Sequence, residues 1–357
     1  MAVTHEIRLP TVQPGRSAAL IGLGLAIYLA YIYQVGHEEV AESLSNVNPA
    51  IFSAVILLSL MNMLFNALSW KKVAEQLNYR VSLTDMFLMY ISGYFLNNLI
   101  PSGSFSGETA RIYFLDKIAA NSRLDASSAT VAATRIITAV PFILGMMIGL
   151  VYLILFYEAP TWALATCILM MIFAIFVGVL FVVICFTDGW LQRIVDVIIS
   201  LVERLSSQEI DRELCSGLVA QFHKSMKLLT ARRLSLLISA FWAVVGWFSM
   251  NMVAFAAFKS LGVEISVFAI FAVYAVVIVF QTLPIILPGG VGLVDIIMTA
   301  LFSAVGVSIH NAAAVTILIR LVQLWFITAL GGLSTIHLVR KVNHNHKQKD
   351  RAATKSF

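Results

Sequence analysis

The sequence predicts an all-α integral membrane protein, and three observations support this. Of its 357 residues, 60% are hydrophobic and only 12% are charged, whereas soluble domains carry about 25% charged residues. The charges are bunched and leave apolar stretches near the roughly 20 residues that a helix needs to cross the bilayer. The third observation is an internal repeat. We expect one membrane domain over residues 1–338 and a basic cytoplasmic tail over 339–357.

Nine apolar runs predict the membrane helices. They span 17–35, 50–70, 83–100, 126–157, 162–186, 234–258, 267–287, 291–305 and 311–338. No small-residue cleavage site closes the first run, so we expect a retained helix rather than a signal peptide. Residues 188–233 alternate apolar and polar side chains at helical spacing, which predicts two amphipathic helices lying on the cytoplasmic membrane surface.

Loop charges predict the orientation, because cytoplasmic loops are enriched in Lys and Arg. Residues 36–49 hold three glutamates and no Lys or Arg, which places that loop outside and the N-terminus inside. Residues 71–80 and 102–125 each hold three basic residues, so both are expected inside. A re-entrant hairpin over 83–119 resolves this conflict, since irregular backbone is tolerated at membrane depth where protein or water covers it. The basic tail is also expected inside, whether 267–305 forms a second hairpin or makes two full crossings.

A short motif occurs twice and predicts an internal repeat. Each copy has a proline, a glycine two residues later and an acid seven residues later: Pro101, Gly103 and Glu108, then Pro288, Gly290 and Asp295. The copies are 187 residues apart, and this offset also carries 50–70 onto 237–257 and 83–100 onto 270–287. A match at a fixed offset is the signature of a repeat.

The two copies begin on opposite sides of the membrane, so the repeat has inverted topology. Secondary transporters share this architecture, and their sites lie near the midplane at broken helices. It makes 267–305 the mirror hairpin and predicts about six full crossings with two opposed re-entrant hairpins. Repeat one covers about 50–157, the surface helices 188–233, and repeat two about 234–338.

Four charged residues in apolar segments are the first candidates for a substrate site. Glu108 and Asp295 lie about one turn beyond a hairpin break, and Arg135 maps two residues from Arg320. An arginine at the bilayer centre costs at least ~2.5 kcal/mol unless it is paired or hydrated, and arginine suits phosphate through two parallel hydrogen bonds. The acids could instead bind a cation or a proton, or cap their helices, and the arginines could form structural salt bridges.

Further candidates surround the two breaks. The predicted substrate-binding set also contains Arg111, Asn97, Asn98 and Gln281, and the hairpin breaks contain Pro101, Gly103, Gly107, Pro288, Gly289, Gly290 and Gly292. Glycines permit tight turns and close backbone approach, although they could simply pack the hairpin arms. The amides are more readily explained as partners of backbone groups freed at the breaks. Arg111 maps onto Met298, which makes the first hairpin the more cationic.

Other function classes find little support in the sequence. No basic face is interleaved with stacking aromatics, so nucleic acid is not an expected partner. The three cysteines, Cys167, Cys185 and Cys215, lack metal-ligand spacing. The sequence has no DxD motif, and no obvious partners accompany His310, His337, His344 and His346, so we expect no metal, no cofactor, no catalytic residue and no enzyme. The alternatives are a membrane glycosyl- or acyltransferase and an accessory subunit that docks a lipid synthase through 190–230.

The break motifs resemble the lysylphosphatidylglycerol synthase transmembrane-region family, which includes the lipid-flipping half of the bacterial multiple peptide resistance factor. The resemblance rests on Asn97-Asn98-Leu-Ile-Pro101-Ser-Gly103, on Gly107-Glu108-x-x-Arg111 and on Leu287-Pro288-Gly289-Gly290-Val-Gly292, and covers about 17–340. One departure is Asp295, where glutamate is expected. No aminoacyl-transfer domain follows, so we do not expect synthesis of lysylphosphatidylglycerol.

That resemblance implies a flippase of the plasma (inner) membrane with both termini cytoplasmic. Its substrate would be an anionic phospholipid or a polyprenyl-phosphate-linked glycolipid. Membrane lipids are therefore the expected partners, with a second copy of the chain or a lipid synthase as further alternatives.

Overall fold

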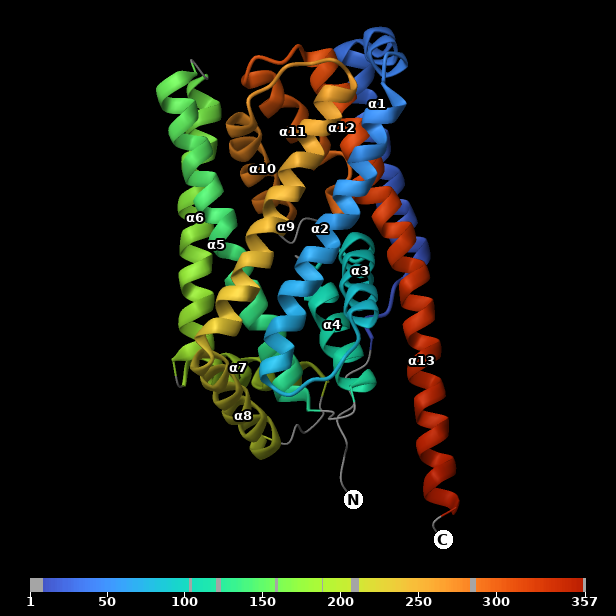
Figure 1. Ribbon diagram of the computed structural model, residues 1–357, viewed down its shortest axis with the longest axis vertical. Helices are drawn as coiled ribbons and strands as arrows, with labels where there is room; N and C mark the ends of the chain where they lie inside the picture. Colours follow the sequence, from blue (N-terminus) through green and yellow to red (C-terminus); the bar gives the residue numbers. More distant parts are fainter. Residues whose placement is uncertain are drawn as a thin grey trace.

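The computed structural model describes residues 9–102, 105–119, 123–157, 160–187, 189–206, 212–282 and 287–355, and every regular element in them is a helix (Figure 1). The elements are α1 (Pro14–Ser45), α2 (Pro49–Gln76), α3 (Leu83–Leu99), α4 (Phe105–Ile118), α5 (Leu124–Phe156), α6 (Thr161–Phe186), α7 (Trp190–Ser206), α8 (Arg212–Ala231), α9 (Arg233–Ser260), α10 (Val267–Thr282), η1 (Pro288–Gly290), α11 (Leu293–Ala304), α12 (Ile309–Arg320), η2 (Leu321–Phe326) and α13 (Ile327–Lys355). Six segments are long and apolar enough to cross a membrane: α1, α2, α5, α6, α9 and the continuous Ile309–Asn345. The prediction of an all-α membrane protein with about six spans is confirmed.

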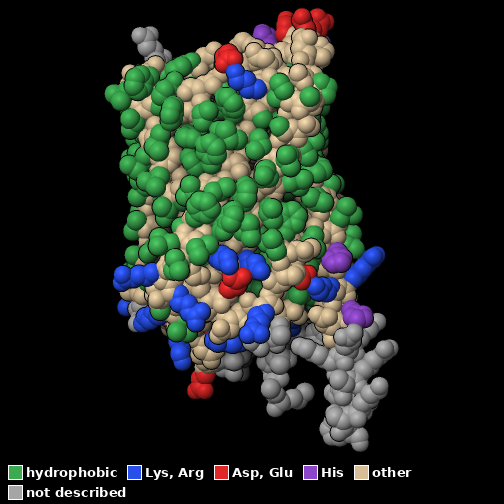
Figure 2. Space-filling view, in the orientation of Figure 1, with side chains coloured by type: hydrophobic (Ala, Val, Ile, Leu, Met, Phe, Trp, Pro, Cys, Tyr) green, Lys and Arg blue, Asp and Glu red, His purple; other side chains and the backbone are tan. Residues whose placement is uncertain are grey.

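Two pairs of short helices lie in opposite halves of the molecule. In Figure 1, α3 and α4 lie in the lower half and α10 and α11 in the upper half. Figure 2 shows a broad belt of hydrophobic side chains over the upper and middle parts of the visible face, with most of the visible Lys and Arg side chains below it. Exposed apolar surface this extensive is a membrane-facing surface rather than a water-facing one.

The first two helices follow from local sequence, with one departure from the prediction. Asn48 caps α2 by accepting hydrogen bonds from the backbone N–H groups of Ala50 (3.0 Å) and Ile51 (3.3 Å). The first helix was expected to end before 36–49, yet α1 continues to Ser45. Gly36 takes a positive φ of 120° there, which only glycine adopts readily, and the chain resumes its helix beyond the kink.

Helices α2 and α9 pack along each other and form the centre of the bundle. The Asn62 side chain donates to the Gly246 carbonyl (2.7 Å), and the hydroxyls of Ser69 and Ser239 lie 2.9 Å apart. Small residues let the backbones approach, and such interhelical hydrogen bonds contribute about 0.6 kcal/mol each on average. This contact joins helices that the 187-residue offset predicts to be equivalent.

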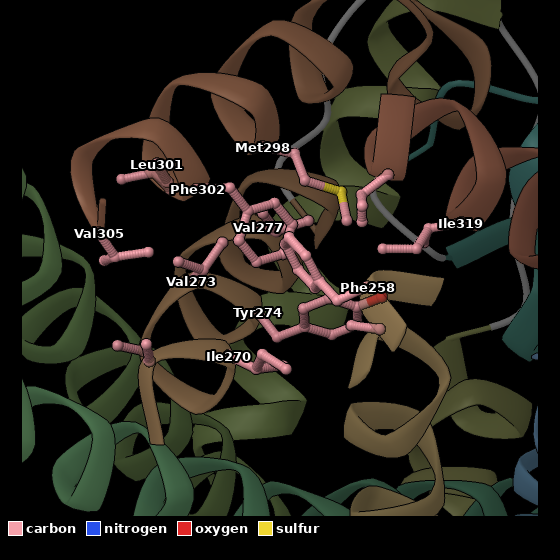
Figure 3. Close-up of a cluster of buried hydrophobic side chains, with 14 of the residues drawn as sticks. Phe258, Ile270, Val273, Tyr274, Val277, Met298, Leu301, Phe302, Val305 and Ile319 are labelled. Carbon is pink, nitrogen blue, oxygen red and sulfur yellow. The ribbon is translucent and has the colours of Figure 1, made fainter. Parts of the chain in front are cut away.

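Each pair of short helices has its own apolar core. Figure 3 shows the upper one, where Phe258 of α9 meets Phe302 of α11 edge to face, with ring centroids 4.8 Å apart. The lower core gathers Met86 and Met89 of α3 with Phe114 of α4, all fully buried. The short helices are therefore supported from within the bundle although they are too short to be membrane spans.

The two amphipathic helices differ from each other in the structure. On α8, Met226 and Leu229 are buried in a small core with α2 and α5, and the Ser225 hydroxyl donates to Asp125 (2.9 Å). On α7, Val197 and Leu201 remain more than half exposed. Both were predicted to lie on the membrane surface, and in the structure part of the apolar face of α8 packs against protein while that of α7 stays exposed. The predicted tail at 339–357 is helical as far as Lys355, as a continuation of α13.

The exposed basic residues at this end are expected to bind anionic lipid. Replacing Lys224, Lys227, Arg232 and Arg233 together by glutamine removes four positive charges, each worth about 1 kcal/mol near an anionic surface. All four are exposed, so the melting temperature should stay unchanged. The measurement is the ratio of anionic to zwitterionic lipid retained after purification from mixed liposomes. An unchanged ratio contradicts this contact.

Candidate functional site

The two sequence breaks meet inside the bundle. A Cβ added to Gly289 would lie 3.5 Å from the Asn98 carbonyl oxygen, so η1 and the end of α3 are in contact. Helix α1 covers the junction, with the Ser17 hydroxyl donating to the Leu99 carbonyl (3.0 Å). A Cβ on Gly24 would lie 2.4 Å from the Val291 carbonyl oxygen, so this approach requires glycine. Two segments far apart in sequence thus form one centre.

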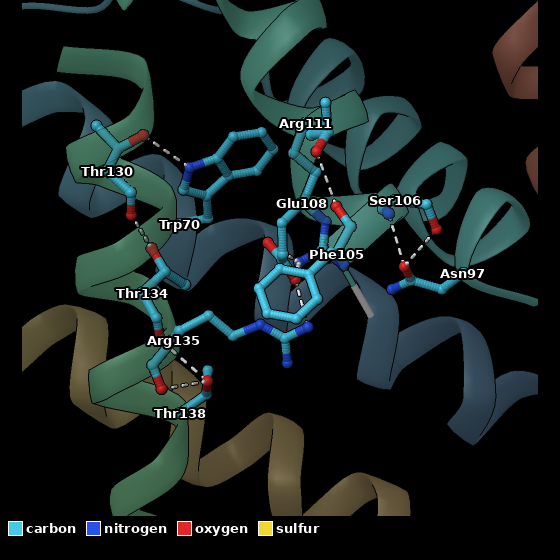
Figure 4. Close-up of polar contacts among 12 residues, drawn as sticks. Trp70, Asn97, Phe105, Ser106, Glu108, Arg111, Thr130, Thr134, Arg135 and Thr138 are labelled. Carbon is cyan, nitrogen blue, oxygen red and sulfur yellow. Dashed lines mark hydrogen bonds and ion pairs between the residues drawn. The ribbon is translucent and has the colours of Figure 1, made fainter. Parts of the chain in front are cut away.

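One carboxylate and two arginines form the first charged cluster (Figure 4). Glu108 lies in the first turn of α4, and Arg111 Nη1 lies 3.2 Å from its Oε1. Arg135 of α5 forms an ion pair with that same oxygen. The Arg111 guanidinium also stacks 3.9 Å above the Tyr90 ring, a cation–π contact that helps compensate its burial. Two cations therefore share a single anion.

The start of α4 is tied to the end of α3 by side-chain hydrogen bonds. Asn97 Oδ1 accepts from the Gly107 backbone N–H (2.6 Å), and the Ser106 hydroxyl donates to the Leu96 carbonyl (3.1 Å). The expected role of Asn97 as a partner for freed backbone is confirmed by this contact. Asn98 instead donates to the Thr328 hydroxyl of α13 (2.7 Å).

The second charged cluster is a buried pair at the start of α11. Asp295 Oδ1 lies 2.6 Å from Arg320 Nε, and Asp295 Oδ2 accepts from the Gly292 backbone N–H (2.7 Å). Arg320 Nη2 also donates to the Gly289 carbonyl (2.7 Å). Asp295 therefore caps its helix and pairs with an arginine, so the two roles considered from sequence coexist. Positive φ angles of 60° at Gly289, 65° at Gly290 and 87° at Gly292 bring these groups together.

A π-helical turn follows Arg320 directly. It spans Leu321–Phe326 and contains Gln323, whose Oε1 accepts from the Tyr274 hydroxyl (3.4 Å). Such turns concentrate at functional sites because the extra residue re-aims side chains and relaxes the regular ladder. The turn lies between two stretches of α-helix, so it redirects side chains without ending the span.

A cavity of ≈ 190 Å³ lies between the two clusters. Arginines and amides supply much of its polar lining: Arg111, Arg135 and Arg320 with Asn62, Asn97, Asn98, Gln281 and Gln323, beside Tyr90, Tyr94, Pro101, Gly289 and Gly290. Glu108 lines a smaller adjoining pocket with Arg111 and Arg135. Asp295 is buried behind Arg320, with its side chain 5% exposed. The arginines therefore face the cavity, while the described lining of the larger space contains no carboxylate.

Some of the remaining predicted residues support the site, and others line the cavity. Gly107 packs against Gly93, and Pro288 is buried, whereas Gly103 lies outside the described residues. Sequence reasoning missed Asn62, Tyr90, Tyr94 and Gln323. The available signal was weak, because each is a polar or amphipathic residue inside an otherwise apolar run.

The chemistry of the cavity follows from this lining. Among the described residues, no group of three or more His, Cys, Asp or Glu side chains could hold a metal ion. Guanidinium groups bind oxyanions through charge-assisted hydrogen bonds, and amides add neutral donors and acceptors. The site is therefore suited to a polar ligand that carries negative charge.

Relatives of the chain are membrane proteins of similar length. A "UPF0104 membrane protein" of Methanothermobacter thermautotrophicus is 26% identical over 319 residues, covering 88% of this chain and 94% of the relative. Proteins with the same description from Pyrococcus horikoshii and Methanocaldococcus jannaschii are each 26% identical, covering 88% and 92% of this chain and 95% and 96% of the relatives.

The family described as "Lysylphosphatidylglycerol synthase TM region" matches residues 17–331, which include both charged clusters and the cavity between them. The resemblance seen in the break motifs thus extends over nearly the whole membrane domain. The chain is a multi-pass membrane protein that belongs to the lysylphosphatidylglycerol synthase transmembrane-region family.

Proposed function

We propose that this protein moves a phosphate-bearing lipid between the two leaflets of the plasma membrane. The substrate is an anionic phospholipid or a polyprenyl-phosphate-linked glycolipid. The observation that carries the proposal is the cavity at the junction of the two breaks, with arginines from both clusters lining it. Charges inside a membrane domain mark substrate pathways because they are otherwise too costly to keep there.

The proposed architecture is an inverted repeat with two opposed re-entrant hairpins, α3–α4 and α10–α11. Its support is the way the helices pair. Helix α3 packs against α13, and α10 packs against α5. The 187-residue offset carries α3 onto α10 and 124–156 onto 311–343, so the two contacts are equivalent. Each helix of the two pairs is shorter than a full span, and the pairs lie in opposite halves of the bundle (Figure 1).

The proposed mechanism is an exchange of anions at the arginines. A lipid phosphate enters the cavity and replaces a carboxylate as the partner of Arg135 or Arg320. The acyl chains stay in the bilayer while the headgroup passes between the two breaks. Each guanidinium keeps an anionic partner throughout, and the displaced carboxylate keeps its second partner, Arg111 for Glu108 or the Gly292 backbone N–H for Asp295. No charge in the site is therefore left without a partner in hydrocarbon.

Transport is proposed rather than group transfer because the nearest carboxylates are already engaged. Glu108 is held by two arginines, and Asp295 by Arg320 and the Gly292 backbone. A general base must be able to accept a proton from its substrate, and neither carboxylate lines the larger cavity.

Reconstituted protein tests the activity. Proteoliposomes carrying phosphatidylglycerol with a fluorophore on one acyl chain would be treated with a membrane-impermeant quencher. We expect the protected fraction to fall below one half, because lipid from the inner leaflet reaches the outer one. Protein-free liposomes and liposomes with an unrelated membrane protein are the controls, and a protected fraction equal to theirs for every lipid tested refutes transport.

Cysteine labelling tests the architecture and the orientation separately. In a cysteine-free background, single cysteines at positions within 38–46 that are not buried should react from outside, and those at such positions within 71–80, 112–119 and 341–345 should react from inside. The basic lower end of the molecule, seen in Figure 2, supports the inside assignment. Labelling of 112–119 only from outside would mean that α3 crosses the membrane fully, which would contradict the inverted repeat.

A further inference from the structure

The charges around the cavity do not balance, and the imbalance bears on the substrate. Three arginines, Arg111, Arg135 and Arg320, stand against two carboxylates, Glu108 and Asp295. The segments next to the breaks that lie outside the described residues, 103–104 and 283–286, contain only Gly, Ser, Leu, Pro and Ile. The cluster therefore carries one net positive charge, which a ligand with a single negative charge neutralises.

Neither carboxylate is positioned to receive a cationic group of a ligand. Asp295 uses both oxygens, one for Arg320 and the other for the Gly292 N–H, and its side chain is 5% exposed. Glu108 Oε1 pairs with both Arg111 and Arg135, and Arg111 Nη1 also donates to Glu108 Oε2 (3.3 Å). An ammonium group entering the cavity would meet guanidinium groups from both halves, and such like-charge contact gives specificity by rejection.

The rest of the polar lining is neutral and hydrogen-bonding. Asn97 commits its oxygen to the Gly107 N–H, which leaves its amide nitrogen as a donor. Asn98 commits its nitrogen to Thr328, which leaves its oxygen as an acceptor. Gln281, Gln323 and Asn62 extend this set around the cavity. Adjacent donors and acceptors match hydroxyl groups, each of which can donate and accept.

We propose that the headgroup is a phosphodiester with one negative charge whose remaining part is uncharged and bears hydroxyl groups, such as glycerol or a sugar. The inference rests on the proposed function and narrows its substrate class. Headgroups with an ammonium group, aminoacylated lipids included, are rejected by the arginines. Diphosphates and phosphomonoesters exceed the single charge that the cluster balances.

A panel of lipids with identical fluorescent acyl chains tests the proposal in proteoliposomes. Phosphatidylglycerol and a glycosyl phosphodiester lipid should move at least tenfold faster than phosphatidylethanolamine, lysylphosphatidylglycerol and phosphatidic acid. Equal rates for phosphatidylglycerol and lysylphosphatidylglycerol overturn the inference and leave the proposed function standing. Movement of no lipid in the panel overturns both.

A second test adds one negative charge to the cavity wall. It measures a ratio of two transport rates, so it stays informative when the variant loses part of its activity. Gln323→Glu places a carboxylate on the cavity wall in nearly the same shape, and it can still accept from the Tyr274 hydroxyl. The rate ratio of phosphatidylglycerol to phosphatidylethanolamine should fall about tenfold. Gln221→Glu, on the exposed surface of α8, is the matched control and should keep the ratio of the unaltered protein. An unchanged ratio in Gln323→Glu contradicts electrostatic selection.

Discussion

Replacing Arg320 by glutamine is expected to abolish headgroup movement and to destabilise the protein. The substitution leaves the buried Asp295 carboxylate with the Gly292 N–H but without its cationic partner. Breaking a buried ion pair by removing one member costs about 3–5 kcal/mol. It also removes the hydrogen bond to the Gly289 carbonyl that holds the second break in place. Melting temperature and lipid movement in proteoliposomes are the two measurements.

A double substitution separates stability from transport at this site. Arg320→Gln with Asp295→Asn removes both charges, so most of the lost stability should return while transport stays absent. Arg135→Gln should also stop transport but cost less stability, because Arg111 still pairs with Glu108. Arg80→Gln, at an exposed position, is the control for loss of a positive charge. Unaltered transport in both Arg320→Gln and Arg135→Gln would contradict the anion-exchange mechanism.

Gly107→Ala is expected to have the second large effect, through geometry alone. A Cβ at this position would lie 2.3 Å from the Gly93 carbonyl oxygen and 2.5 Å from Asn97 Nδ2. Helix α4 would have to move away from α3, which breaks the Asn97 hydrogen bond and displaces the adjacent Glu108. Overpacking typically costs about 1–3 kcal/mol, and we expect at least a tenfold loss of lipid movement because Glu108 and Arg111, both on α4, would shift relative to Arg135 of α5.

The matched control for this prediction is Gly178→Ala on α6. Its added Cβ would meet only Ile143 Cδ1 at 3.9 Å, an ordinary contact, so stability and transport should be unchanged. Thermal unfolding in detergent followed by reconstitution of the folded fraction gives both readouts. If Gly107→Ala behaves like Gly178→Ala, the close approach of α3 and α4 is not required for function.

Much of the fold could be predicted because membrane helices are a matter of length and composition. Each apolar run contains a helix among the described residues, and six runs contain the candidate spans: 17–35, 50–70, 126–157, 162–186, 234–258 and 311–338. Helix ends were less predictable. Gly36 gave no sign that α1 would continue to Ser45, since glycine serves a turn and a kink equally well. The contacts of α8 could not be predicted for a similar reason, because an apolar helix face can pack against either lipid or a neighbouring helix.

The candidate site was predicted in part. Charged residues in apolar runs are rare enough to be noticed singly, so Glu108, Arg135, Asp295 and Arg320 could be selected before any contact was known. The sequence left open whether the two acids and the two arginines form ion pairs with one another. Neutral lining residues such as Asn62 and Gln323 carry no such signal, because an amide in a membrane helix is as often structural as functional.

The sequence by itself determined the membrane location, the helical spans and the two break motifs, because hydrophobic length and special residues such as proline and glycine act locally. The tertiary structure alone decided which charges share a cavity and which are buried behind it. That outcome depends on the close contact of η1 with α3 and on one carboxylate oxygen serving both Arg111 and Arg135. The contact of Gly289 with Asn98 joins residues 191 positions apart, and the ion pair of Glu108 with Arg135 joins two different helices. Local sequence does not encode the distances between such residues.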